Sequence, residues 1–433
     1  MNRFIFDTNV QNIGLVITVV FMLYFRTLFN DPSVDDVNLL KRKPRPFSFY
    51  PPKFAAYFYG VGSIINKYLD RLLHMSLFCA ICLLINHLWG LAPALLYATN
   101  PINNQIAMWQ NGRRYSMVIL ICLLGLTTPW ALPLYLYVPY LQVTGLPFVL
   151  VLAHKYVWFV PFIALGGWVA WNTSIKSFIR SRLPKIQQKE RTVFNKNKLV
   201  FAIKSLGFYI VNSIVPTTKL MYYPKFEGFS LTNQYTEQIY SLNRDFWLSI
   251  VTLVAVTWVA ISTGNLTYWL YYLILIFPWL NWITVTQTLT DRYASISTVF
   301  LCVILGNILP LEALMPLLFM YTVATVKQNR MYSSLESFFD FHLYNSKSLD
   351  ALYFYAVNLI LNGHFVDAFV ILKNGLVEYP TDYRLNLLMC QVAMKLNPPN
   401  ARFFLDKARE NIYNGESYDK IDKFDLILQE KGF

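Results

Sequence analysis

The chain has little charge. Only 14% of its 433 residues are Asp, Glu, Lys or Arg, whereas 55% are hydrophobic and 17% are aromatic. About a quarter of the residues of a soluble domain are charged. The sequence therefore predicts an integral membrane protein and argues against a water-soluble one.

Several motifs that identify soluble enzymes are also missing. The sequence has no Gly-rich phosphate loop, no dinucleotide fingerprint and no Ser-His-Asp order. His87, His342 and His364 show no metal-ligand spacing, so no metal site is predicted, although a need for a divalent metal stays open. The five cysteines form no disulfide or zinc framework, and the pair Cys79 and Cys82 lies in an apolar run where plain packing is expected.

Positive charge is concentrated in the first part of the chain. Residues 1–326 contain 25 Lys and Arg against 11 Asp and Glu, whereas residues 327–433 contain 12 and 13. Such a basic balance can indicate nucleic-acid binding. In an apolar chain it is more typical of basic cytoplasmic loops and of contact with a phosphate-bearing lipid, so no nucleic-acid partner is expected.

Long apolar runs predict about eleven membrane spans. A span needs about 20 apolar residues, and no cleavable signal peptide is evident, so the first run is expected to be an anchor. The predicted spans lie near residues 13–29, 68–88, 89–99, 115–130, 132–151, 153–171, 199–217, 246–263, 266–288, 295–309 and 311–326.

The basic loop 172–204 sets the expected orientation. It contains nine Lys or Arg and one acid, Glu190, and basic loops stay in the cytoplasm. Counting spans from this loop puts the segments 30–66, 100–114 and 221–245 and the C-terminal tail on the exoplasmic side. The host membrane is predicted to be a bacterial inner membrane, with the endoplasmic reticulum as the alternative. A basic cluster at 41–45 departs from this scheme unless its charges serve an anion.

A polar, basic insert at residues 100–117 is the strongest candidate for a functional site. It reads Asn-Pro-Ile-Asn-Asn-Gln-Ile-Ala-Met-Trp-Gln-Asn-Gly-Arg-Arg-Tyr-Ser-Met and follows an apolar run. Membrane helices rarely hold two arginines beside Asn-Pro and Trp unless these groups line a watery cavity or an interface.

The tail, residues 327–433, is predicted to be a separate helical domain. Small and apolar residues fall at tetratricopeptide positions, with a proline at the end of the unit, as in a repeat of two helices in about 34 residues. These residues are Leu352, Tyr355, Ala356, Leu359, Gly363, Phe365, Ala368, Leu372, Gly375 and Pro380. A second, degenerate unit is expected between Tyr383 and Tyr413. The predicted class is therefore all-α: a polytopic membrane domain (1–326) followed by a short tetratricopeptide-like domain (327–433).

Six motifs in order resemble a family of multi-spanning O-mannosyltransferases that carry tetratricopeptide repeats and use polyprenyl-phosphate sugars. The insert is similar to the family's loop with His-Pro, Glu, Trp and Gly-Arg, here at Asn100, Gln105, Trp109 and Gly112-Arg113. The other five motifs are Arg45-Pro46-Phe47, Gly60 with Leu73-His74, His154-Lys155-Tyr156 before Pro161, Asp291-Arg292-Tyr293, and the segment from Met331 to Leu335.

The resemblance implies an inverting glycosyltransferase that moves a sugar, mannose in this family, from a polyprenyl- or dolichyl-phosphate donor. The acceptor would be a protein hydroxyl or a glycan, which the repeats could bind. Such a transfer needs a carboxylate to take the acceptor's proton and cations to stabilise the departing phosphate. The expected carboxylate is Asp35 or Asp36 in the first outer loop. Asp7 is the alternative, because its spacing to Arg45 matches the family better although it precedes the first apolar run.

Four cations are expected at the donor phosphate: Arg45, Arg113, Lys155 and Arg292. Arg113 could instead snorkel to the membrane interface. Asp291 and Arg292 could form a structural pair that holds helix ends, and His74 could belong to a structural polar cluster.

The sequence departs from the family at four ionisable positions. The family's His, Glu, acid after Gly-Arg and Glu after Lys are here Asn100, Gln105, Tyr115 and Tyr156. A second hypothesis is therefore a catalytically degenerate relative that serves as a membrane scaffold or partner-binding protein. A transporter is disfavoured because the two halves of the chain show no internal symmetry.

Overall fold

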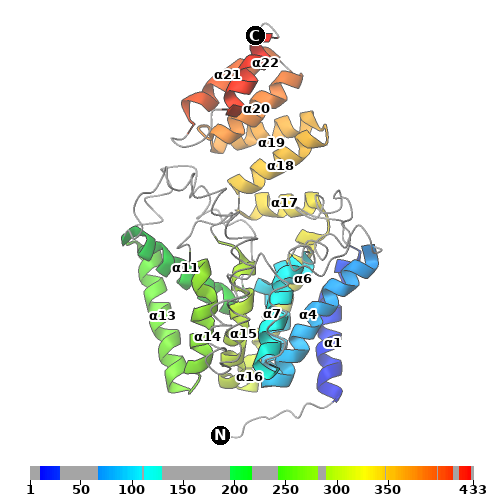
Figure 1. The fold of residues 1–433 in the computed structure, drawn as a ribbon, viewed down its shortest axis with the longest axis vertical. Helices are drawn as coiled ribbons and strands as arrows, with labels where there is room; N and C mark the ends of the chain where they lie inside the picture. The colour runs from blue at the N-terminus through cyan, green and yellow to red at the C-terminus, as the bar shows by residue number, and fades with distance from the viewer. Residues whose placement is uncertain are drawn as a thin grey trace, which may run out of the picture. The chain divides into compact units, whose positions relative to one another are not determined.

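The structure, a computed structural model, describes residues 10–29, 67–109, 112–128, 196–216, 242–280, 289–346, 348–396, 398–412 and 419–430. Regular structure within these ranges is entirely helical, which confirms the all-α class. The described residues fall into two compact units (Figure 1): unit 1 takes those up to Phe338 and unit 2 those from Phe339 onward. The two units are described separately below.

Unit 1 is built from helices, most of which overlap the predicted apolar runs. They are α1 (Val10–Tyr24), η1 (Phe25–Leu28), α4 (Lys67–Trp89), α5 (Leu91–Thr99), η3 (Pro101–Asn103), α6 (Asn104–Met108), α7 (Arg113–Thr127), α11 (Lys196–Ile214), α13 (Arg244–Ser262), α14 (Leu266–Ile276), η10 (Phe277–Trp279), α15 (Asp291–Ile308), α16 (Leu311–Asn329) and η11 (Arg330–Tyr332). Helix α17 (Leu335–Ser346) begins in unit 1 and ends in unit 2.

Three of the described helices are long and apolar enough to cross a membrane: Val10–Leu28, Arg71–Trp89 and Arg244–Ser262. The predicted spans at 132–151 and 153–171 lie outside the described residues. The run at 89–99 was expected to be a short span, but Gly90, with a φ of +94°, ends α4, and α5 has only nine residues. At 1.5 Å per residue such a helix is far shorter than the 30 Å hydrocarbon core, so this span prediction is wrong.

Helices α5 and α15 form the buried centre of unit 1. Residues Asp291 to Ile304 of α15 are all buried, and α5 packs against α15, α4, α1 and α16. The backbones approach closely where Gly306 of α15 meets Pro93 of α5, because a Cβ at Gly306 would lie 2.7 Å from the proline ring. Gly207 of α11 faces Ser249 of α13 in the same way. Small residues at such crossings are typical of helix packing in membranes.

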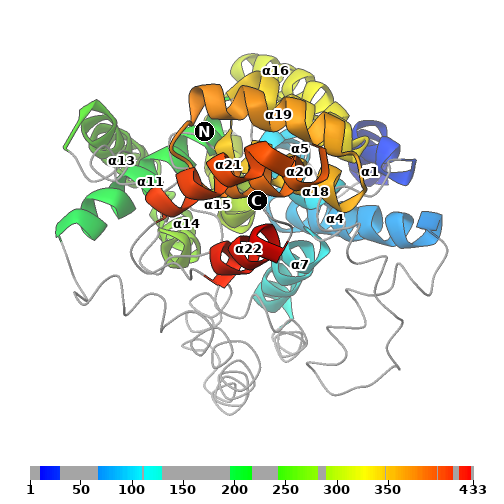
Figure 2. The same ribbon diagram turned by 90° about the horizontal axis from the view of Figure 1, so that it is seen from above.

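Apolar side chains cover the outside of unit 1. Helices α1 and α13 lie at opposite edges of this unit in both views (Figures 1 and 2). On α13, Trp258 is 69% exposed, and the neighbouring Val251, Val254 and Ile261 are exposed as well. Helix α16 likewise exposes Leu311, Met315, Phe319 and Val323.

Unit 2 is a succession of helices in which each packs on the next. They are the second part of α17 and helices α18 (Leu349–Leu361), α19 (Phe365–Glu378), α20 (Tyr383–Leu396), α21 (Pro398–Glu410) and α22 (Asp419–Glu430). Helices α18 and α20 begin 34 positions apart, at Leu349 and Tyr383. That spacing is the period of a tetratricopeptide repeat, and the arrangement is compatible with helical-repeat packing.

The core of unit 2 is apolar. Leu352, Ala356, Leu372 and Leu385 belong to one buried cluster, and α20 to α22 enclose a second cluster around Leu405. Gly375 lets α19 approach α18, since a Cβ there would lie 2.5 Å from Leu352.

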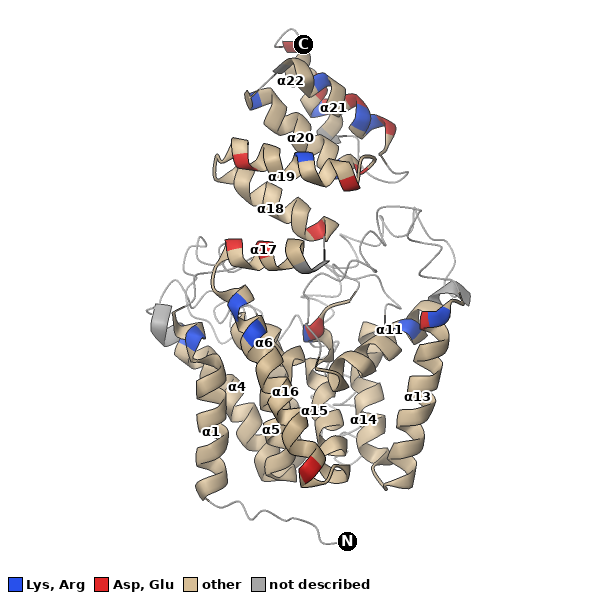
Figure 3. Cartoon of the chain, turned by 180° about the vertical axis from the view of Figure 1, so that it is seen from behind, with Lys and Arg blue, Asp and Glu red and all other residues tan. Residues whose placement is uncertain are grey.

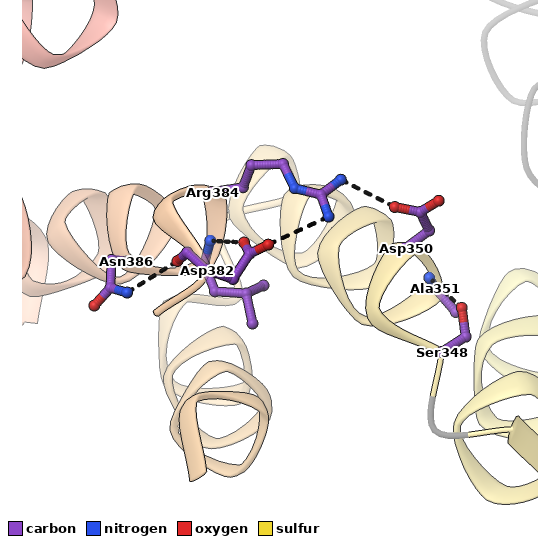
Figure 4. Close-up of polar contacts among 7 residues, drawn as sticks. Ser348, Asp350, Ala351, Asp382, Arg384 and Asn386 are labelled. Atoms are coloured by element: carbon purple, nitrogen blue, oxygen red, sulfur yellow. Dashed lines mark hydrogen bonds and ion pairs between the residues drawn. The ribbon is translucent and has the colours of Figure 1, made fainter. Parts of the chain in front are cut away.

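An ion-pair network joins the starts of α18 and α20 (Figure 4). The Arg384 guanidinium donates to Asp350 at 2.9 Å and to Asp382 at 3.4 Å. Burial by itself lowers the pKa of Arg384, but the two carboxylates outweigh it and the pKa lies above its ordinary value. Ser348 accepts a hydrogen bond from the Ala351 amide, and Asp382 accepts one from the Leu385 amide, so each helix has an N-terminal cap.

Candidate functional site

The first residue of the polar insert, Asn100, lies directly after the end of α5. The Asn100 side-chain oxygen accepts a hydrogen bond from the Ile102 amide at 3.1 Å, which starts the short helix η3, and Pro101 occupies the first position of that helix. Proline is favoured there because the first helical N–H has no partner within the helix. The Asn100 amide nitrogen donates to the Ser213 carbonyl of α11 at 2.7 Å. Asn100 therefore fastens the insert to α11.

The described side chains of the insert are packed inside unit 1. Asn100, Asn103 and Asn104 are completely buried, and Gln105, Trp109 and Arg113 are almost so. An outer loop was expected here, with polar groups facing a watery cavity or an interface. The burial corrects the expectation of exposed polar groups, because Asn100, Asn104 and Gln105 each form a side-chain hydrogen bond with a neighbouring helix. The side of the membrane on which the insert lies stays a prediction. Asn104, for example, accepts from the Tyr24 hydroxyl at 3.2 Å and donates to the Thr325 carbonyl at 3.3 Å.

Gln105 caps helix α15 from another part of the chain. Its side-chain oxygen accepts hydrogen bonds from the Thr290 hydroxyl at 2.8 Å and from the Arg292 amide at 3.1 Å. The first amide groups of a helix have no partner within it, so Gln105 supplies one of the missing acceptors. Gly112 allows the start of α7 to approach α6 closely, since a Cβ there would lie 2.8 Å from the Gln105 carbonyl oxygen.

The Arg292 guanidinium lies among aromatic rings. Its central carbon is 5.1 Å from the ring centroid of Trp109, 5.2 Å from Tyr293 and 5.9 Å from Tyr115. Trp279 in turn stacks on Tyr293, with the two ring centroids 4.0 Å apart. These distances are within the range of cation–π attraction, which is strongest away from water. We call the residues Gln105, Trp109, Tyr115, Arg292 and Tyr293 the Arg292 cluster.

Four nitrogen atoms of the Arg292 cluster have no hydrogen-bond partner within the described part of the chain. They are Gln105 Nε2, Trp109 Nε1, and Arg292 Nε and Nη1. All four carry hydrogen and can only donate. A buried donor without a partner costs about 1–3 kcal/mol. The chemical group that suits this cluster is therefore rich in acceptors, and a phosphate or a sugar oxygen fits that description.

His74 of α4 lies next to the insert. It is completely buried beside the backbones of Ile106 and Ala107, and Arg113 and Arg71 are both close enough to act on its charge. Neither ring nitrogen forms a hydrogen bond of good geometry within the described residues. His74 and Arg113 thus lie near each other and near the short helix α6 that carries Gln105.

The structure brings together several of the residues predicted from the sequence. Gln105, Trp109 and Arg292 are in contact, Asp291 is buried as the first residue of α15, and His74 and Arg113 are close to each other. Asn100 is directed elsewhere, to α11. The predicted residues Asp7, Asp35, Asp36, Arg45 and Lys155 lie outside the described residues. Among the described residues there is no group of three or more His, Cys, Asp or Glu that could hold a metal ion.

Sequence reasoning did not assign roles to Tyr115, Thr290 and Trp279. The available signal was local: Tyr115 and Tyr293 each directly follow an arginine, Arg114 and Arg292. That three aromatic residues from separate segments surround one guanidinium depends on the packing of α7 and α15.

Comparison with protein-family models, with curated proteins and with solved structures finds no match to this chain. The function is therefore inferred from the site itself and from the resemblance of the motifs.

Proposed function

We propose that this protein is a membrane glycosyltransferase that moves a sugar, mannose by resemblance, from a polyprenyl-phosphate donor to a protein hydroxyl or a glycan. The observation that carries the proposal is the set of unpaired donors in the Arg292 cluster. Gln105, Trp109 and Arg292 have buried N–H groups for which the described residues offer no acceptor. Preorganised donors away from water are what stabilises a departing phosphate.

The reaction is a single displacement at the anomeric carbon. The bond from that carbon to the donor phosphate oxygen breaks as a bond to the acceptor hydroxyl oxygen forms. The acceptor's proton passes to a carboxylate, for which Asp35 or Asp36 is proposed and Asp7 is the alternative. The leaving phosphate takes up negative charge, and Arg292 and Arg113, together with Arg45 and Lys155, are proposed to stabilise it. Attack from the face opposite the phosphate inverts the sugar.

The exposed apolar helices support a multi-pass placement in a lipid bilayer. A soluble protein rarely exposes a large contiguous apolar patch, yet α1, α13 and α16 expose Val, Ile, Phe, Met and Trp side chains along their length. Three described helices meet the length and composition of a membrane span. We propose that lipid covers these faces, in a bacterial inner membrane or the endoplasmic reticulum, with the tail on the exoplasmic side.

The experiment is transfer of label from a set of radiolabelled polyprenyl-phosphate sugars by the purified protein. The variants are Arg292→Gln, the double variant Asp35→Asn/Asp36→Asn, and the matched control Arg330→Gln, in which an exposed arginine of the same unit is changed. We expect the wild type and the control to transfer one sugar. The Arg292 variant should lose at least about two orders of magnitude of rate, as when a transition-state donor is removed, and the Asp variant should lose about as much because the acceptor's proton then has no base. Full activity of Arg292→Gln would refute the assigned phosphate site.

A second candidate function is a membrane scaffold without catalysis. The observation that favours it is that the two amides at the family's ionisable positions are engaged in structural bonds, Asn100 to Ser213 and Gln105 to the start of α15. If no donor sugar is transferred by wild type while unit 2 still captures a partner, the scaffold is the better reading.

A further inference from the structure

Helix α19 of unit 2 has an apolar stripe on its exposed side. Val366, Val370, Lys373 and Val377 follow one another at intervals of four, three and four residues, so they lie on one face of the helix. Val377 is 78% exposed and Val366 is 65% exposed, and Phe369 lies beside them. The buried residues Ala368 and Leu372 occupy the opposite side and pack into the core.

The two ends of unit 2 differ in charge. Helices α18 and α19 contain four charged residues in total, one and three, whereas α21 and α22 contain five and six. Figure 3 shows the same contrast, with blue and red concentrated on α21 and α22. The exposed apolar stripe therefore belongs to the weakly charged end of the unit, where Leu361 at the end of α18 is also exposed.

The stripe has the composition of a surface that contacts lipid headgroups. An interfacial helix buries an apolar face at the boundary between headgroups and acyl chains. A lysine within such a face can extend its ammonium group to the headgroup level while its methylene stem stays apolar, and Lys373 has this position. The acids Asp367 and Glu378 lie to one side of the stripe, about a quarter turn or more from its centre line.

A short length of chain ties this end of unit 2 to the apolar helices of unit 1. Twenty positions separate Asn329, the end of α16, from Leu349, the start of α18, and twelve of them are in α17. Even fully extended outside α17, this segment spans less than about 50 Å. A bilayer that surrounds α16 is therefore always within reach of α19, at a high effective concentration.

We propose that the α19 stripe docks on the surface of the lipid bilayer. This inference rests on the membrane placement of unit 1 in the proposed function, and it does not depend on sugar transfer. Docking would hold unit 2 at the membrane surface, where an acceptor and a lipid-linked donor can be brought together.

The test uses the full chain reconstituted in vesicles of phosphatidylcholine with brominated acyl chains. An environment-sensitive fluorophore is attached at Val377→Cys, with Trp258→Cys on α13 as the membrane reference and Lys423→Cys on α22 as the water reference. The unmodified chain gives the background of the native cysteines. We expect the label at 377 to be blue-shifted and quenched on the order of twofold more than the label at 423, because an interfacial face lies about 5–10 Å below the headgroups.

Matched variants decide whether the stripe causes the docking. Val370→Asp places a charge in the stripe and is expected to abolish quenching at 377, whereas Asn374→Asp, on the flank of the same helix, is expected to leave it unchanged. Quenching at 258 without quenching at 377 would overturn the proposal and leave the membrane placement intact. Absence of quenching at both positions would overturn both. A blue shift at 377 that persists in detergent and fades on dilution would identify a second copy of the chain as the occupant and would also overturn it.

Discussion

The two units of this chain differ in how many polar side chains they bury and in where their charged residues lie. In unit 1 the interior holds asparagine, glutamine, arginine and aspartate side chains among its apolar ones, while Trp258, Val254 and Phe319 face outward. In unit 2 the interior holds leucine, alanine and valine, while most of the charge lies on the surface of α21 and α22. Both are all-helical in their described parts, so the difference does not lie in secondary structure.

The comparison is compatible with lipid around unit 1 and water around unit 2. In water the burial of apolar side chains stabilises a fold, and unit 2 has such apolar buried clusters. In lipid, helices gain little from burying apolar surface against one another, and they associate through close packing and hydrogen bonds between helices. Unit 1 shows both features, at Gly306 against Pro93 and at Asn104 between Tyr24 and Thr325.

The largest effect is expected from removing a core side chain of unit 2. Leu372 is completely buried, and Leu372→Ala should lower the free energy of unfolding of unit 2 by about 2–5 kcal/mol through lost burial and a cavity. The matched control Val377→Ala removes an exposed side chain of the same helix and should change the free energy of unfolding by less than about 0.5 kcal/mol.

Alkylation of Cys390 provides the measurement for that pair. Burial raises the pKa of this thiol to about 12, so it reacts as unit 2 opens, and a denaturant series of alkylation rates gives the stability. Equal effects of the two variants would contradict the assignment of a water-type core to unit 2.

A charge on the outside of unit 1 should act next most strongly. Val254 lies in the exposed face of α13, and Val254→Asp should disfavour insertion by about 2.5–3.5 kcal/mol if that face contacts lipid. The same change on unit 2, Leu426→Asp on the exposed side of α22, should leave insertion unaffected. The membrane-integrated fraction after alkaline extraction measures insertion of both variants. Normal integration of the α13 variant would contradict the difference in surroundings inferred for the two units.

Loss of the Gln105 cap should have a moderate effect. Gln105→Leu keeps the volume but leaves the Thr290 hydroxyl and the Arg292 amide without their acceptor, which should cost about 1–3 kcal/mol. Thermal unfolding of the detergent-solubilised chain measures it, with Asn362→Leu on an exposed turn of unit 2 as the control. Gln105→Glu retains an acceptor and should restore the cap, so equal destabilisation by Leu and Glu would argue against capping.

The smallest effect is expected at the surface of unit 2. Asp425 accepts hydrogen bonds from Arg409 at 2.7 Å and Arg402 at 2.5 Å, and chiefly the bond from Arg409 holds the pKa of this carboxyl below its ordinary value. Asp425→Asn should therefore destabilise unit 2 by no more than about 1 kcal/mol.

The pH dependence of that effect has a definite sign. A carboxyl group with a lowered folded-state pKa stabilises the fold at pH values above its unfolded pKa, near 4, and the stabilisation disappears as the pH falls through the folded value. The difference between wild type and Asp425→Asn, followed by denaturant unfolding monitored by circular dichroism, should be constant from pH 8 to about pH 5 and shrink below about pH 4. A difference that grows in acid would contradict the assignment.

Much of the helical content of this protein can be predicted from the sequence. The apolar runs near 13–29, 246–263 and 295–309 all lie within described helices, because length and composition decide whether a segment is helical in either solvent. The prediction of a span at 89–99 was wrong because one residue, Gly90, adopts a backbone conformation that ends a helix in an otherwise apolar stretch. Hydropathy does not register such a break, since glycine changes the average of a window very little.

The candidate site was likewise predictable only in part from the sequence. The residue types were available to sequence reasoning: Gln105, Trp109 and Arg113 occur together in a polar insert, and Asp291 and Arg292 in a second motif. The sequence did not show that these residues contact one another. Gln105 and Arg292 are separated by 187 positions and meet only when α6 packs against the start of α15. The roles of Tyr115 and Tyr293 as faces of one cation–π arrangement depend on the same packing.

The sequence by itself determined the all-helical class, the apolar character of the first part of the chain and the 34-residue spacing of helices in the tail, because composition and periodicity are local properties. Only the tertiary structure decided that the polar insert is buried, that Gln105 caps α15 and that Arg292 lies among three aromatic rings. The physical reason is that a hydrogen bond or a cation–π contact depends on distances of a few ångströms between residues far apart in the chain, and the packing of helices sets those distances.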